Sequence, residues 1–119
     1  MPIVSFCDFA RIMSYDVSRK SDPCIEVSFK VSDSLRYQDS WLGKMLDKET
    51  NQPVYWLGLV PDGSEAYDYD SFEMLSNAAV FNGKSLREIW GKLIIVSIDG
   101  GDVSDIIPYY LTTIVNDIE

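Results

Sequence analysis

Leu93-Ile94-Ile95-Val96-Ser97-Ile98 is the strongest apolar run of the chain, and Asp99-Gly100-Gly101 ends it. Consecutive branched aliphatic residues closed by a turn signal are typical of a strand that is buried on both faces. We therefore predict a central β-strand over residues 93–98, around which the rest of the fold is arranged.

Two other segments also have strand patterns. Apolar residues alternate with polar ones over residues 24–31, with the period of two that a half-buried strand requires. Residues 54–60 form a compact aromatic and β-branched run that Pro61-Asp62-Gly63 stops, which predicts a second buried strand. Residues 32–52 are ambiguous, because Trp41, Leu42, Met45 and Leu46 fit either a short helix or an irregular strand.

Helix signals lie between these strands. Ser5 followed by Asp8 resembles a capping box and predicts a helix over residues 6–14. Ser71 predicts a short helix to about Asn77, and Ser85 with Glu88 forms a second capping box. A C-terminal helix is expected from Asp102 onward, with Asp102 or Ser104 as its N-cap. We therefore expect an α+β fold, a single small domain over residues 1–119 with a central β-sheet, short helices packed on it and a C-terminal helix.

The charge is sorted along the chain. All ten Lys and Arg lie in residues 1–48 and 84–92, whereas residues 49–83 and 93–119 contain eleven carboxylates and no basic residue. The net charge is −9. Such a surface should attract a cationic partner and repel nucleic acid, so no nucleic acid is expected as a partner.

Several residue types that carry chemistry are missing or sparse. Histidine is absent, which removes the commonest general base and metal ligand. Cys7 and Cys24 are too few and too far apart for a zinc motif, and we expect them to be buried thiols. No catalytic residue, metal or cofactor is predicted. No stretch approaches the roughly 20 apolar residues that span a bilayer, and the N-terminus lacks a signal-peptide pattern, so we expect a cytoplasmic protein without membrane contact.

The densest group of carboxylates lies between Asp62 and Glu73. As a calcium loop this segment fails, because its acidic residues are out of register for the motif. A paired-carboxylate acid/base site and a merely solvated loop both stay open. The preferred interpretation is a protein-recognition surface, in which carboxylates bind Arg and tyrosines supply rigid contact area. The candidate contact residues are Asp62, Glu65, Tyr67, Asp68, Tyr69, Asp70 and Glu73.

A second candidate patch comprises Asp99, Asp102 and Asp105. It follows a strand and contains Gly100-Gly101, but three carboxylates without a Lys or Arg would repel phosphate. The favoured interpretation of this segment is a strand-to-helix turn with Asp102 or Ser104 as N-cap, and a second acidic contact surface is the alternative. The aromatic residues Trp41, Tyr55, Trp56 and Trp90 are expected to pack in the core, because a stacking platform for nucleic acid would need a cationic groove.

The segment from Phe81 to Trp90, followed by Lys92–Ile98 and Asp99-Gly100, resembles a stretch of small bacterial immunity proteins. These belong to contact-dependent growth inhibition and related polymorphic toxin systems. The resemblance covers residues 54–100 and includes no signature of chemistry. It implies a cytosolic antitoxin that binds one cognate toxin domain and blocks its active site or its access to substrate.

Acidity and small size agree with that role, because toxins that cut nucleic acid need cationic surfaces. Two alternatives stay open. One is a phosphate-mimicking inhibitor or accessory subunit of a nucleic-acid enzyme. The other is a small hydrolase that depends on a carboxylate.

Overall fold

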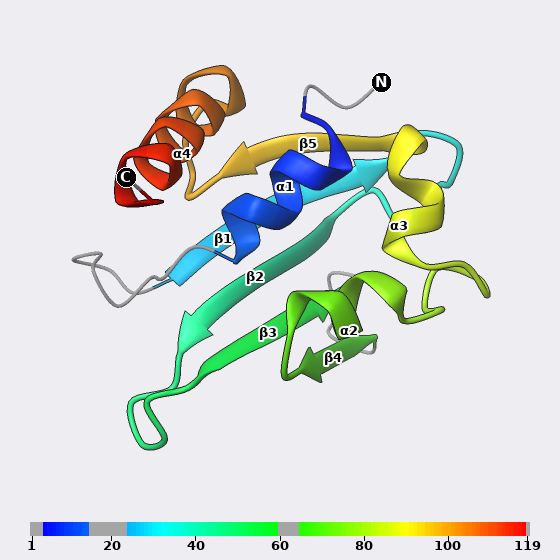
Figure 1. The fold of residues 1–119 in the computed structure, drawn as a ribbon. Coiled ribbons are helices and arrows are strands. Elements are labelled where there is room, and N and C mark those ends of the chain that lie inside the picture. The colour runs from blue at the N-terminus through cyan, green and yellow to red at the C-terminus, as the bar shows by residue number, and fades with distance from the viewer. Residues whose placement is uncertain (1–3, 15–23, 60–64, 119) are drawn as a thin grey trace.

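The computed structural model describes residues 4–14, 24–59 and 65–118 (Figure 1). It is a single α+β domain built on one five-stranded antiparallel sheet, with the strand order β4-β3-β2-β1-β5. The elements are α1 (Phe6–Met13), β1 (Cys24–Val31), β2 (Ser40–Leu46), β3 (Pro53–Gly58), β4 (Ala66–Tyr69), α2 (Phe72–Asn77), α3 (Leu86–Ile89), the 3₁₀ turn η2 (Trp90–Lys92), β5 (Leu93–Ile98) and α4 (Val103–Ile118).

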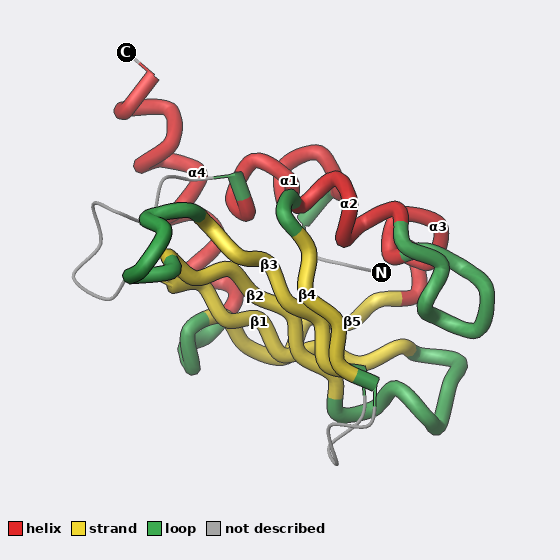
Figure 2. Tube along the Cα trace, turned by 90° about the horizontal axis from the view of Figure 1, so that it is seen from below, coloured by secondary structure: helices red, strands yellow, loops and turns green. Residues whose placement is uncertain are grey.

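The helices cover one face of the sheet. Figure 2 shows α1, α2 and α3 above the sheet, and α4 packs beside them against α1 and β5. No described helix lies on the opposite face, which we call the bare face. Within the described ranges, no helix has the length and apolar character needed to cross a membrane.

The helix starts are where the sequence predicts them. The side chains of Ser5, Ser71 and Ser85 each accept a hydrogen bond from a backbone N–H in the first helical turn. At α3 the bond is reciprocal, because Glu88 also accepts from the backbone N–H of Ser85, at 3.1 Å. Caps of this kind satisfy N–H groups that have no partner within the helix. The prediction of these three starts is confirmed.

The core lies between the helices and the covered face. The strand β1 sends alternate side chains into it, and Ile25 and Val27 are fully buried. The ring of Phe9 on α1 packs against Trp90, with ring centroids 4.9 Å apart, and against Phe72 at 5.8 Å. Burial of one such side chain contributes about 1.5–3 kcal/mol to folding. These rings therefore join α1, α2 and the end of α3 over the sheet.

Among the residues that the structure describes, Lys44 on β2 is the one charged residue that is buried, with 4% of its surface exposed. Its Nζ donates a hydrogen bond to the carbonyl oxygen of Met13, the last residue of α1, at 3.1 Å. The hydroxyl of Tyr55 donates to the same oxygen at 3.2 Å. A cation at the C-terminal end of a helix is electrostatically favourable. Lys44 therefore anchors α1 to the sheet.

The structure corrects several expectations. Residues 93–98 form a strand, but it is the edge strand β5 and not a central one. Residues 66–69, expected as part of an acidic loop, form the edge strand β4. The ambiguous segment contains the strand β2. Cys7 is exposed and Cys24 partly exposed, so the expectation of two buried thiols is wrong.

Candidate functional site

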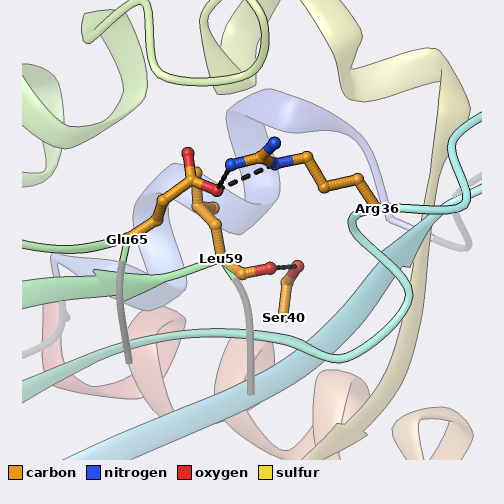
Figure 3. Close-up of polar contacts among 4 residues, drawn as sticks. All are labelled: Arg36, Ser40, Leu59 and Glu65. Carbon is orange, nitrogen blue, oxygen red and sulfur yellow. Dashed lines mark hydrogen bonds and ion pairs between the residues drawn. The ribbon is translucent and has the colours of Figure 1, made fainter. Parts of the chain in front are cut away.

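Glu65 precedes β4 and already has a cationic partner within the chain. Its carboxylate accepts a hydrogen bond from Nε of Arg36 at 2.8 Å, and Nη2 of Arg36 contacts the same oxygen (Figure 3). Only 19% of the Glu65 side chain is exposed, against 61% for Arg36. Glu65 was predicted as a contact for a partner's Lys or Arg. Its position favours a structural role that ties the loop after β1 to the start of β4.

The backbone around Glu65 is held as well. Its carbonyl oxygen accepts a hydrogen bond from the N–H of Leu59 at 2.9 Å. The carbonyl of Leu59 in turn accepts from Oγ of Ser40 at 3.0 Å, as Figure 3 shows. Ser40 is fully buried. The two ends of the connection between β3 and β4 are therefore fixed to each other and to β2.

The alternation of β4 separates the predicted contact residues onto two faces. Tyr67 and Tyr69 lie opposite Leu57 and Tyr55, whose side chains are buried under the helices, whereas Asp68 lies opposite Trp56 on the bare face. Tyr67 lines a hollow of about 560 Å³ together with Arg36 and Glu65. Tyr69 packs against the core, and burial raises its pKa.

Asp70 and Glu73 are exposed beyond the end of β4. Glu73 lies in the first turn of α2, where the helix dipole favours a carboxylate. Within the described part of the chain, neither these two residues nor Asp68 form an ion pair. Asp68, Asp70 and Glu73 therefore remain as carboxylates that a cationic partner can reach. Asp62 lies outside the described residues.

In the second candidate patch, Asp99 and Asp102 form hydrogen bonds within the chain. Asp99 accepts hydrogen bonds from the backbone N–H of Glu26 at 2.9 Å and from the hydroxyl of Tyr110 at 2.7 Å. Asp102 caps α4, because its side chain accepts from the hydroxyl of Ser104 at 2.6 Å and from the backbone N–H of Ser104 at 2.8 Å, and these two bonds lower its pKa. The predicted role of Asp102 as an N-cap is confirmed. Asp105 is exposed in the first turn of α4.

The two predicted patches lie at opposite edges of the sheet. The order β4-β3-β2-β1-β5 puts four strand spacings between them, about 19 Å at roughly 4.8 Å each. They do not form one surface. A single partner would have to cross the whole sheet to contact both.

The arrangement is better suited to binding than to acid/base chemistry. Asp68, Asp70 and Glu73 are exposed to water, whereas a catalytic carboxyl of raised pKa needs an apolar pocket. Among the residues that the structure describes, no group of three or more His, Cys, Asp or Glu is placed to hold a metal ion.

Sequence reasoning missed the tryptophans of the bare face. Trp41 is 45% exposed and Trp56 partly exposed, so the expectation that both pack in the core is wrong, whereas Tyr55 and Trp90 are buried as expected. A signal for this existed. The triplet Trp-Leu-Gly occurs twice, at residues 41–43 and 56–58. In a strand, the tryptophan and the glycine of such a triplet lie on the same face, and the glycine leaves space that an indole on the neighbouring strand can fill.

Comparison of the chain with protein-family models, curated proteins and solved structures gives no match. The resemblance to immunity proteins therefore stays a prediction from the sequence.

Proposed function

We propose that this chain is an immunity protein that binds and neutralises a cognate, basic bacterial toxin domain in the cytoplasm. The observation that carries the proposal is that Asp68, Asp70 and Glu73, which follow one another from β4 to the first turn of α2, are exposed and have no ion-pair partner among the described residues. Carboxylates of this kind accept charge-assisted hydrogen bonds from Arg and Lys.

The overall charge supports the same partner. A molecule of net charge −9 attracts a cationic domain over a distance of about one Debye length and accelerates its association. A toxin that acts on nucleic acid has such a cationic surface, because it must contact phosphates. Occupation of that surface by an acidic protein would exclude the substrate without any catalytic step.

Charge reversal at the β4 edge tests the contact surface. We expect the double substitution Asp68→Lys and Asp70→Lys to weaken toxin binding by roughly two orders of magnitude, measured by calorimetry, because attraction becomes repulsion. The matched control is Asp39→Lys with Glu49→Lys, which changes the net charge equally at two exposed positions outside β4. Equal weakening by both pairs, or by neither, would contradict the assignment.

The partner itself is identified by capture. The tagged protein should retain one dominant basic toxin domain from its native host at moderate salt, and co-expression should protect cells from that domain. A phosphate-mimicking inhibitor would instead bind several unrelated basic enzymes. A hydrolase would show an activity that one carboxylate substitution abolishes without unfolding the protein.

A further inference from the structure

The two Trp-Leu-Gly triplets lie side by side on neighbouring antiparallel strands. In the register of β2 and β3, Trp41 is opposite Gly58, Leu42 is opposite Leu57, and Gly43 is opposite Trp56. The two leucines are almost fully buried under the helices. The period of two then places both tryptophans on the bare face.

Each indole therefore has a glycine across from it. A side chain at Gly43 would overlap the ring of Trp56, so that indole occupies the space beside Gly43 on β2. Space is open around Gly58, opposite Trp41. Met45, 48% exposed, extends the same surface along β2. We call this aromatic area of the bare face the tryptophan platform: Trp41, Gly43, Trp56 and Gly58.

Carboxylates flank this platform. Asp68 on β4 is opposite Trp56, and Glu26 on β1 is opposite Gly43, so one row across the sheet reads Asp68, Trp56, Gly43, Glu26. Three strand spacings, about 14 Å, separate its ends. Both carboxylates are exposed, and neither forms an ion pair within the described ranges. On the described strands, Lys30 is the one basic residue on this face.

The chemistry of the platform fits a guanidinium group. A cation over an indole face is attracted by the ring quadrupole, and the planar guanidinium of Arg can stack there while it bonds a carboxylate with two N–H groups. A second copy of the chain fits less well. Its own Asp68 and Glu26 would approach the same carboxylates, and both molecules carry a charge of −9.

We propose that the tryptophan platform, with Asp68 and Glu26, is a docking site for arginine side chains of a basic protein partner. The inference rests on the proposed function for the identity of that partner, a toxin domain. It adds that docking occurs on the bare face and that arginine, not lysine, is the preferred contact.

Peptides of nine arginines and of nine lysines test the site without the toxin. Trp90 is buried, so a change in tryptophan emission on binding reports mainly Trp41 and Trp56. We expect the arginine peptide to quench this emission and to bind several-fold more tightly than the lysine peptide. Equal affinity for the two peptides would overturn the proposal, because charge alone would then explain binding.

Variants locate the contact, with affinity measured by calorimetry so that the loss of a tryptophan does not remove the signal. We expect Trp41→Ala, and separately Glu26→Gln with Asp68→Asn, to weaken arginine-peptide binding about tenfold. The control Met74→Ala removes an apolar side chain that is 53% exposed on α2, on the covered side, and should bind like the parent protein. Circular dichroism verifies folding. Binding of Trp41→Ala that equals that of Met74→Ala would overturn the proposal.

The outcomes separate this inference from the proposed function. If the arginine peptide binds selectively but no toxin is captured, the site stands and the proposed function fails. If the toxin is captured and Trp41→Ala binds it unchanged, the function stands and the site is wrong. Sedimentation that shows dimers of the protein dissociating on Trp41→Ala would assign the face to a second copy and also overturn the proposal.

Discussion

Gly43 lies opposite Trp56 in the sheet, and the space that its missing side chain leaves is filled by the indole ring. A Cβ at this position would also come within 2.6 Å of the carbonyl oxygen of Ile25, which belongs to the backbone of β1 and cannot move aside as a side chain can. Gly58 is its counterpart opposite Trp41, with open space around it. Two glycines of the same motif thus have different surroundings.

We expect Gly43→Ala to lower the free energy of unfolding by about 1–3 kcal/mol, because the added methyl group forces Trp56 and the backbone apart. Gly58→Ala should change it by less than about 1 kcal/mol, since nothing is displaced and the unfolded chain becomes less flexible. Urea denaturation of the two variants checks this. Equal destabilisation would show that the indole does not occupy the space beside Gly43.

Among the elements, α4 packs against β5 and is also hydrogen-bonded to the sheet through the carboxylate of Asp99. Asp99 follows β5 with a positive φ of 53° and links the N–H of Glu26 on β1 to the hydroxyl of Tyr110 on α4. Tyr110 is 2% exposed. Its burial, and then its hydrogen bond to Asp99, raise the pKa of the phenol above its ordinary value of 10.0.

This raised pKa predicts a loss of stability in alkali. The folded state holds the Tyr110 proton above pH 10, whereas the unfolded chain releases it, so the free energy of unfolding falls as pH rises beyond about 10. Tyr110→Phe should cost about 1 kcal/mol at neutral pH and make that decline shallower. Tyr109→Phe, on a side chain that is 65% exposed, should do neither. Chemical denaturation at several pH values measures both effects, and identical pH profiles for the two variants would contradict the prediction.

The elements also show what the sequence can predict. The strand β1 and the three serine-capped helix starts are local patterns, and they are confirmed. The position of β5 at the edge of the sheet depends on pairing between distant segments, so no local pattern predicts it. Leu93 and Ile95 face the core while Ile94 and Val96 are exposed, and apolar residues on both faces imitate a buried central strand.

The same ambiguity hid the tryptophan platform. Trp41 on β2 is exposed and Trp90 at the end of α3 is buried, although the two side chains are the same, because their exposure depends on which elements pack over them. The partner of Glu65 was equally hidden, because Arg36 lies 29 residues earlier in the chain. For the candidate site, the sequence shows the charge and proposes contact residues, but it does not show the faces on which β4 displays them.

For the whole molecule, several cations are already neutralised by nearby acids. Arg11, Arg36 and Lys92 form ion pairs with Asp8, Glu65 and Asp33. Surface pairs of this kind contribute little to stability. The electrostatic field of the molecule depends instead on its net charge of −9, because nineteen carboxylates outnumber ten basic residues.

The negative electrostatic field predicts that association with a cationic partner depends strongly on salt. The association rate constant of a cationic partner, measured by stopped flow with the nine-arginine peptide, should fall steeply between about 0.05 and 0.5 M NaCl as the Debye length shortens. The dissociation rate constant should change less, since contacts at short range are screened less. A salt-independent association rate would show that the charge does not guide the encounter.

The exposed Cys7 on α1 has a practical use. It belongs to the helical layer, on the opposite side of the sheet from Trp41. With Cys24→Ser in the background, a fluorophore attached at residue 7 would stay in solvent if a captured partner docks on the bare face, and would be shielded from a soluble quencher if it docks on the helices. One thiol can thus report the orientation of the complex before its structure is determined.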